Sequence, residues 1–80
     1  MARTPLYMPQ LGNEITEAQV DFWLKAVGDA VAEGEPIVSV TTPKVTMELE
    51  APAAGILAEI LVAEEDLANV GAELAIIETG

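Results

Sequence analysis

The sequence contains no cysteine and no histidine among its 80 residues. Without cysteine there can be no disulfide bond, no thiolate metal site and no cysteine nucleophile. Without histidine the chain lacks the commonest metal ligand and the usual general base, and it has no glycine-rich phosphate-binding loop. The sequence therefore predicts a domain that is not an enzyme by itself and that binds no metal.

Basic residues are almost as scarce. Arg3, Lys25 and Lys44 stand against fourteen acidic residues, which gives a formal net charge of −11 at pH 7. Such a surface repels nucleic-acid phosphates and anionic lipid, so neither nucleic acid nor a membrane is expected as a partner. The sequence also has no apolar run of membrane-spanning length and no signal-peptide pattern at its N-terminus.

Aromatic residues number only one Phe, one Trp and one Tyr, so a core must be built mainly from Val, Ile, Leu and Ala. After the turn that follows Thr42, the residues Val45, Met47 and Leu49 alternate with polar residues, which is typical of a half-buried strand. Frequent Gly and Pro punctuate the chain at intervals suited to short strands. We predict strands at residues 6–8, 18–26, 37–41, 45–50, 55–62 and 73–78, with brief strands near residues 30 and 67. Two facing antiparallel sheets would then bury the apolar positions.

The two halves of the chain resemble each other at an offset of 37 residues, the distance from Asp29 to Asp66. Gly34 and Gly71 stand at the same offset. The repeat predicts a domain with pseudo-twofold symmetry. Under this symmetry the turn around Lys44 corresponds to the pair of chain ends, so Lys44 and the two termini are expected at opposite poles.

Lys44 is the strongest candidate functional residue. It lies in the turn Thr42-Pro43-Lys44-Val45 between two segments of strand character. Proline presets φ for the second position of a type I turn, and Lys44 takes the third position with its side chain in solvent. A stiff hairpin of this kind would hold the amine at a reproducible place for covalent modification. The other lysine, Lys25, is expected to be an ordinary solvated residue of a strand.

The sequence also resembles a known family over nearly its full length. The resemblance is carried by a series of short motifs in order and at the spacing of that family: Met8-Pro9-Gln10-Leu11-Gly12, Trp23-Leu24-Lys25, Val27-Gly28-Asp29-Ala30-Val31, Glu33-Gly34-Glu35-Pro36-Ile37, Thr42-Pro43-Lys44-Val45, Ala51-Pro52-Ala53-Ala54-Gly55 and Val70-Gly71-Ala72-Glu73-Leu74. These motifs are similar to those of the lipoyl domains of dihydrolipoamide acyltransferases, the core subunits of 2-oxo acid dehydrogenase complexes.

This resemblance implies an all-β fold, a flattened eight-stranded barrel or sandwich of two four-stranded antiparallel sheets. It implies lipoic acid in amide linkage on Lys44, with Thr42, Pro43 and Val45 as turn neighbours. The lipoyl arm would carry acyl groups and reducing equivalents between active sites. The implied partners are a lipoate-attaching enzyme, a thiamin-diphosphate-dependent 2-oxo acid decarboxylase, an acyltransferase domain and dihydrolipoamide dehydrogenase.

Two features of the site are specific expectations from the same resemblance. The loop of residues 10–17 is expected beside the arm, where Leu11, Gly12, Asn13 and Glu14 would help the decarboxylase choose its carrier. Pro43 stands where the family usually has Asp, so a carboxylate beside the arm is missing. A biotin carrier of a carboxylase and an unmodified binding module of the same fold are the alternative hypotheses.

The organisation of the whole protein follows from the resemblance as well. Residues 1–80 are expected to form a single lipoyl domain at the N-terminal part of a longer acyltransferase chain. Such a complex would lie in the cytoplasm of a bacterium or in the mitochondrial matrix of a eukaryote.

Overall fold

The computed structural model describes residues 2–79, which form two four-stranded antiparallel sheets. One sheet has the strand order β1-β8-β6-β3 and the other β5-β4-β2-β7. The strands are β1 (Ala2–Tyr7), β2 (Glu17–Trp23), β3 (Ala30–Val31), β4 (Pro36–Thr41), β5 (Thr46–Glu50), β6 (Gly55–Ile60), β7 (Leu67–Asn69) and β8 (Glu73–Thr79). The predicted all-β class and both brief strands are confirmed. No helix that could cross a membrane occurs in residues 2–79.

The first strand begins earlier than its sequence pattern indicates. The predicted strand covers residues 6–8, whereas β1 runs from Ala2 and pairs with β8 from Ala2↔Thr79 onward. Pro5 obscures the pattern, because a proline cannot donate to a strand ladder and is tolerated mainly at a sheet edge. Since β1 is an edge strand, Pro5 fits there opposite Ile76.

The predicted pseudo-twofold symmetry is present in the sheets and in the backbone hydrogen bonds. Replacing β1, β8, β6 and β3 by β5, β4, β2 and β7 turns one sheet order into the other. The Gly28 N–H donates to the Leu57 carbonyl at 2.8 Å, and the Glu65 N–H donates to the Val20 carbonyl at 2.6 Å. Residues 28 and 65, like residues 20 and 57, stand 37 positions apart. The same backbone hydrogen bond therefore occurs once in each half of the repeat.

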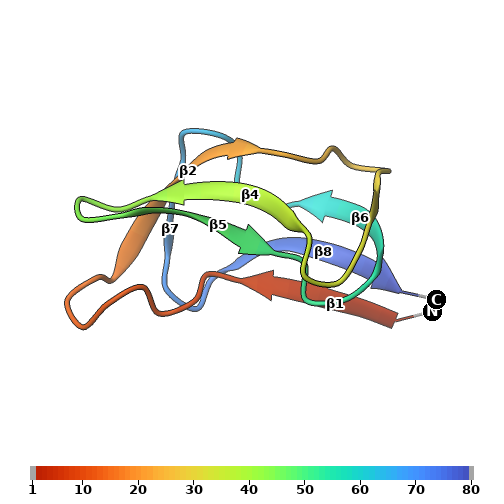
Figure 1. The fold of residues 1–80 in the computed structure, drawn as a ribbon, viewed down its shortest axis with the longest axis horizontal. Coiled ribbons are helices and arrows are strands. Elements are labelled where there is room, and N and C mark those ends of the chain that lie inside the picture. The colour runs from red at the N-terminus through yellow and green to blue at the C-terminus, as the bar shows by residue number, and fades with distance from the viewer. Residues whose placement is uncertain (1, 80) are drawn as a thin grey trace.

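The symmetry sets the lysine hairpin and the chain ends at opposite poles of an elongated domain measuring 37 × 19 × 18 Å (Figure 1). The hairpin joins β4 to β5, and its symmetry mate is the pair β8 and β1, which carries the two chain ends. In Figure 1 the hairpin and the loop between β1 and β2 project at the left, while the N and C labels lie together at the right. The predicted polar layout is therefore observed.

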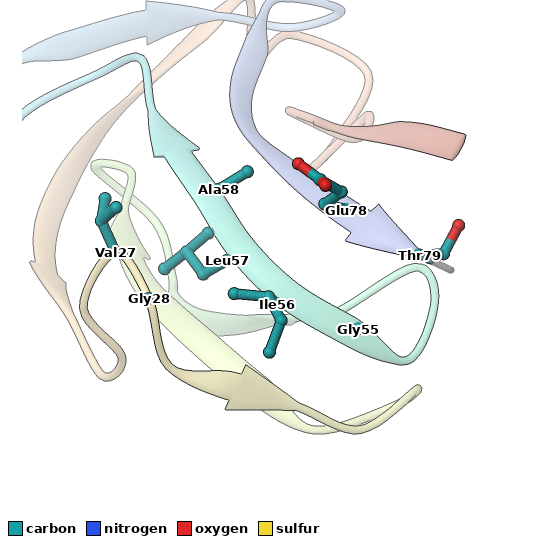
Figure 2. Close-up of a pocket in the computed structure, with 8 residues that line it drawn as sticks. All are labelled: Val27, Gly28, Gly55, Ile56, Leu57, Ala58, Glu78 and Thr79. Atoms are coloured by element: carbon teal, nitrogen blue, oxygen red, sulfur yellow. The ribbon is translucent and has the colours of Figure 1, made fainter. Parts of the chain in front are cut away.

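At the pole with the chain ends, β6 and β8 approach each other very closely at Gly55 (Figure 2). A Cβ atom added to Gly55 would lie 2.2 Å from the backbone oxygen of Glu78. No side chain fits there, which explains why β6 begins with glycine.

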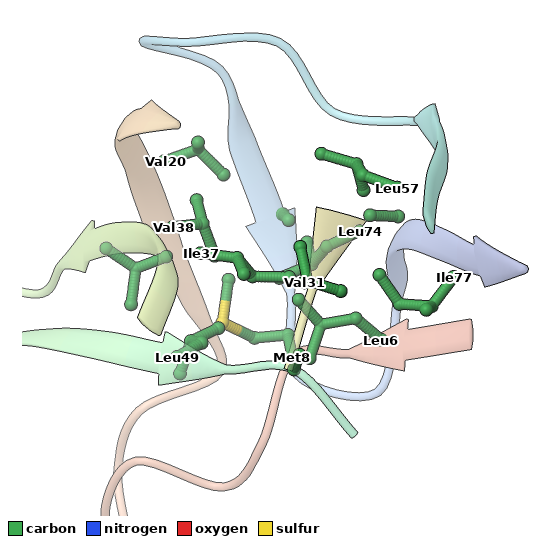
Figure 3. Packing of buried hydrophobic residues seen from close by; sticks show 14 of the residues in the cluster. Leu6, Met8, Val20, Val31, Ile37, Val38, Leu49, Leu57, Leu74 and Ile77 are labelled. Atoms are coloured by element: carbon green, nitrogen blue, oxygen red, sulfur yellow. The ribbon is translucent and has the colours of Figure 1, made fainter. Parts of the chain in front are cut away.

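The core between the sheets is aliphatic, as the composition requires (Figure 3). Its members come from all eight strands and from the segments that follow β1 and β5; they are Leu6, Met8, Ala18, Val20, Val31, Ile37, Val38, Val40, Leu49, Ala51, Leu57, Ala68, Leu74, Ala75 and Ile77. Trp23 packs against this core and donates its indole N–H to the Val62 carbonyl at 3.0 Å. The buried apolar surface is the main stabilising contribution to a domain without disulfides.

Candidate functional site

The hairpin turn is fastened by the hydroxyl group of Thr42. This residue is only 5% exposed, and its Oγ1 donates to the Val45 carbonyl at 3.1 Å. The same oxygen accepts the Lys44 N–H at 3.2 Å and the Val45 N–H at 3.0 Å. The Thr42 N–H also donates to the Val45 carbonyl, at 2.7 Å. One buried side chain thus satisfies the backbone on both sides of Lys44.

The pairing of β4 with β5 fixes where the turn begins and ends. Thr41 and Thr46 form the last registered pair of β4 and β5 before the turn. Pro43 follows Thr42 in a trans peptide bond, since residues 2–79 contain no cis peptide, and its ring restricts φ. The loop therefore has few conformations available, as the turn residues predict.

Lys44 itself is exposed. Among the ion pairs within residues 2–79, Arg3 contacts Glu59 at 3.0 Å and Lys25 contacts Glu35 at 3.2 Å, while Lys44 has no carboxylate within 4 Å. The two lysines thus differ in their contacts. The Lys25 ammonium group pairs with Glu35, which directly precedes β4, whereas the Lys44 amine is available to react. The expectation that Lys25 is a solvated residue of a strand is wrong on both points, because β2 ends at Trp23 and the Lys25 ammonium group pairs with Glu35.

The loop between β1 and β2 lies beside the lysine turn. Residues from the loop, from β7 and from the turn line a common groove of about 520 Å³, among them Glu14, Ile15, Pro43, Lys44 and Leu67. Leu67 was not expected at the site; it is a large apolar side chain that is 61% exposed. An exposed Leu on a brief strand has no sequence pattern that distinguishes it from a core residue.

The loop has its own internal bracing. The Ile15 N–H donates to the Gly12 carbonyl at 3.2 Å, and the Gln10 side-chain amide donates to the carbonyls of Gly12 and Ile15. Leu11 packs against the core, whereas Asn13 and Glu14 are exposed. Of the four loop residues named from the sequence, Glu14 therefore lines the groove with Lys44, and Leu11 anchors the loop.

Carboxylates give this groove a negative lining beside the lysine. Glu14 and Glu17 both contribute to it, opposite the turn that carries Pro43 and Lys44. Within residues 2–79 no three His, Cys, Asp or Glu side chains are grouped so that they could hold a metal ion. The arrangement presents an amine in a fixed place beside two carboxylates.

Fold and site together define a small β-sandwich that presents a free lysine on a stiff hairpin opposite its chain ends. The model of a family described as "Biotin-requiring enzyme" matches residues 4–77. The chain belongs to this biotin/lipoyl family, as its motifs indicate.

Relatives within that family are acyltransferase components. The chain is 47% identical over 74 residues to the dihydrolipoyllysine-residue acetyltransferase component of the pyruvate dehydrogenase complex of Corynebacterium glutamicum, covering 92% of this chain and 11% of the relative. It is 46% identical over 77 residues to the succinyltransferase component of the 2-oxoglutarate dehydrogenase complex of Bartonella vinsonii, covering 96% of this chain and 19% of the relative. The chain thus spans less than a fifth of the length of these two proteins.

Solved structures show the same fold. The lipoyl domain of the 2-oxoglutarate dehydrogenase complex from Azotobacter vinelandii superposes with a TM-score of 0.77 at 36% identity and covers 95% of this chain and 96% of that one. The urea carboxylase of Kluyveromyces lactis contains a similar fold, with a TM-score of 0.82, 23% identity and coverage of 98% of this chain and 6% of that one. The resemblance to lipoyl domains of acyltransferases is confirmed, and with it the function of a carrier domain that does not catalyse a reaction by itself.

Proposed function

We propose that lipoic acid is attached to the Nζ atom of Lys44 and that the resulting arm serves a 2-oxo acid dehydrogenase complex. The observation that carries this proposal is the exposed lysine in a turn that Thr42 fastens, with no carboxylate of residues 2–79 within 4 Å of its amine. Attachment requires that ATP first activates the lipoate carboxyl group as an acyl adenylate. The Nζ atom then attacks the acyl carbon, the bond to the AMP phosphate breaks and AMP leaves, and the amine loses its proton and with it the charge of the lysine. An amine without an ion pair gives up no stabilising contact in this step.

The neighbours of Lys44 have separate roles in the proposal. Thr42 and Pro43 restrict the backbone, so an attaching enzyme meets a preorganised turn and less conformational entropy is lost on binding. Val45 is 46% exposed and offers apolar contact next to the lysine. The loop residues Leu11, Gly12, Asn13 and Glu14 would be read by the decarboxylase, because their loop shares a groove with the turn.

Partners beyond the attaching enzyme follow from the relatives. Their names include both pyruvate and 2-oxoglutarate complexes, so the proposal is made for 2-oxo acid dehydrogenase complexes as a class. In such a complex the arm would meet a thiamin-diphosphate-dependent decarboxylase, an acyltransferase domain and dihydrolipoamide dehydrogenase. The domain would be one part of a longer acyltransferase chain.

Lipoate is favoured over biotin by two observations. The relatives at 46–47% identity are dihydrolipoyllysine acyltransferases, whereas the likeness to urea carboxylase, at 23% identity, concerns the fold alone. In addition, biotin carriers usually flank the lysine with methionines, and this chain has Pro43 and Val45 there.

The test is incubation of the purified domain with a lipoate ligase, lipoate and ATP, followed by intact mass analysis. One lipoyl group is expected on the wild-type chain and none on Lys44→Arg, with Lys25→Arg as the matched control that is still modified. A parallel reaction with a biotin ligase is expected to leave the domain unmodified. Modification of Lys44→Arg at Lys25, or biotin in place of lipoate, would contradict the proposal.

A further inference from the structure

Beside the lysine hairpin, a carboxylate on the neighbouring strand is tied into the hairpin by hydroxyl groups. Asp21 lies in β2 at a bulge in the pairing with β4, between Val20 and Phe22. Its Oδ2 atom accepts a hydrogen bond from the Thr41 hydroxyl, and the Ser39 hydroxyl lies 3.5 Å from the same oxygen. The Thr41 and Thr46 hydroxyl oxygens are 3.2 Å apart.

The direction of these hydrogen bonds follows from the chemistry of the groups. An ionised carboxylate only accepts, so the Thr41 hydroxyl must use its one hydrogen on Asp21. The Thr41 oxygen then accepts from Thr46, and the chain of bonds runs from Thr46 through Thr41 to Asp21. Successive hydroxyl dipoles that point at a carboxylate strengthen one another. Three adjacent strands, β5, β4 and β2, are thereby linked at the base of the lysine turn.

The symmetry-related sheet shows that the fold does not require this network. The mate of Asp21 is Ala58, which also lies at a bulge, between Leu57 and Glu59. The mates of Thr41 and Thr46 are Glu78 and Arg3, since the pair Thr41↔Thr46 corresponds to Arg3↔Glu78. The carboxylate–hydroxyl network therefore occurs in the sheet with the lysine hairpin, while its mate sheet has an alanine at the corresponding bulge.

We propose that Asp21 is a positioning residue for the lysine turn. Through Thr41 it holds the last pair of the hairpin, and through that pair the Thr42 turn, in the conformation that an attaching enzyme recognises. This inference rests on the proposed modification of Lys44, and it assigns to β2 a part in a site otherwise formed by the turn and the loop of residues 10–17. Asp21 does not contact the reacting amine in this account.

Hydrogen exchange tests the positioning role independently of any modification. In Asp21→Ala the amides of Thr42 and Val45 are expected to exchange about tenfold faster, because hydrogen bonds to a charged group are lost. The Leu57 amide in β6 and the Leu61 amide, which donates to the Leu74 carbonyl of β8, are expected to keep their rates. Asp21→Asn, which retains an acceptor without the charge, should give an intermediate value. Glu50→Ala removes a carboxylate from the far end of β5 and serves as the charge-matched control, with no change expected.

The KM and kcat of a lipoate ligase then test whether the conformation of the turn affects its recognition by the ligase. Asp21→Ala is expected to raise the KM for the domain about threefold to tenfold, since a looser turn must be ordered on binding, while kcat stays within about twofold. Thr46→Val breaks the outer link without changing Asp21 and should raise the KM in the same direction, which keeps the test valid if Asp21→Ala folds poorly.

The outcomes separate the two proposals. If the wild-type domain is not modified at Lys44, the proposed function fails, whereas faster exchange confined to the turn would still support the positioning role. An equal rise in exchange in both sheets, or unchanged exchange and KM in Asp21→Ala and Thr46→Val, would overturn the inference about Asp21.

Discussion

The two poles of the domain are built from the same strand pairs and differ in how the chain closes them. At one pole β4 and β5 are joined through Thr42, Pro43, Lys44 and Val45, and the Thr42 hydroxyl binds the backbone on both sides of the lysine. At the other pole the mates of these strands, β8 and β1, are paired from Ala2↔Thr79 and end there. A pseudo-twofold fold thus offers two equivalent ends, of which one carries the chain ends and the other is closed, stiff and exposed. The lysine that we propose to be modified thus lies at the pole that a turn closes.

The largest difference between the symmetry mates is predicted at Gly55 and Ala18, which stand 37 positions apart. Gly55→Ala places a Cβ 2.2 Å from the Glu78 backbone oxygen, so β6 and β8 must separate. We expect the free energy of unfolding to fall by about 3 kcal/mol, at the upper end of overpacking effects. Ala18→Gly, by contrast, should lower it by about 1 kcal/mol through backbone entropy and lost packing. Urea unfolding of both variants makes the comparison; equal losses would show that the two bulged sheets are packed alike.

A smaller effect is predicted for the closed pole. Thr42→Val removes the hydroxyl group that accepts the Lys44 and Val45 N–H groups. The loss should reduce the free energy of unfolding by about 1–2 kcal/mol and speed exchange of these two amides. Thr42→Ser keeps the hydroxyl and should restore most of the stability. Thermal unfolding with amide exchange checks this, and a Thr42→Val turn as protected as the wild type would contradict the role given to Thr42.

The mated turns at Gly28 and Glu65 should respond to substitution in opposite directions. Both have positive φ, 98° at Gly28 and 72° at Glu65, a region that favours glycine. Gly28→Ala should destabilise by about 1 kcal/mol. Glu65→Gly relieves strain of similar size and increases the entropy of the unfolded chain, so a net gain of about 0.5 kcal/mol is expected. Chemical denaturation measures the free energy of unfolding of both variants. A destabilised Glu65→Gly variant would show that the backbone of Glu65 is not strained.

The smallest effect concerns pH. The Ala32 N–H, followed by the Lys25 ammonium group, holds the pKa of Glu35 below its ordinary value of 4.5, and the symmetry mate of Glu35 is Ala72. A lowered pKa in the folded state stabilises the domain above 4.5, and this contribution is lost as the pH falls below 4.5 through the folded-state pKa. The melting temperatures of wild type and Glu35→Gln should therefore differ most near neutral pH and converge on acidification. A difference in melting temperature that grows on acidification would contradict a lowered pKa of Glu35.

Much of this fold can be read from the sequence because its patterns are local. The β-branched run before Thr42 and the repeat of Gly34 at Gly71 each reflect one strand or turn. Alternation in residues 45–50 predicts the strand β5, but not its burial: only Leu49 is buried, whereas Val45 is 46% and Met47 39% exposed. The start of β1 escapes this reasoning, since Pro5 resembles a strand breaker until the edge position of β1 is known. The position of Lys44 was accessible because turn chemistry and the chain repeat both point to it.

The contacts that surround Lys44 depend on tertiary register and were not accessible in the same way. Thr42 is recognisable as a turn residue, but its buried hydroxyl and its three partners depend on the rotamer and on packing. Asp21 faces Thr41 only because a bulge shifts β2 against β4. Leu67 joins the groove because β7 pairs with β2, a contact between residues far apart in sequence.

The most direct test of the central claim is peptide mass mapping of the protein isolated from its own cells. We expect a lipoyl amide on the peptide that contains Lys44 and none on the peptide that contains Lys25. An unmodified Lys44 in cells whose other lipoyl proteins carry lipoate, or a biotinyl group at that position, would contradict it.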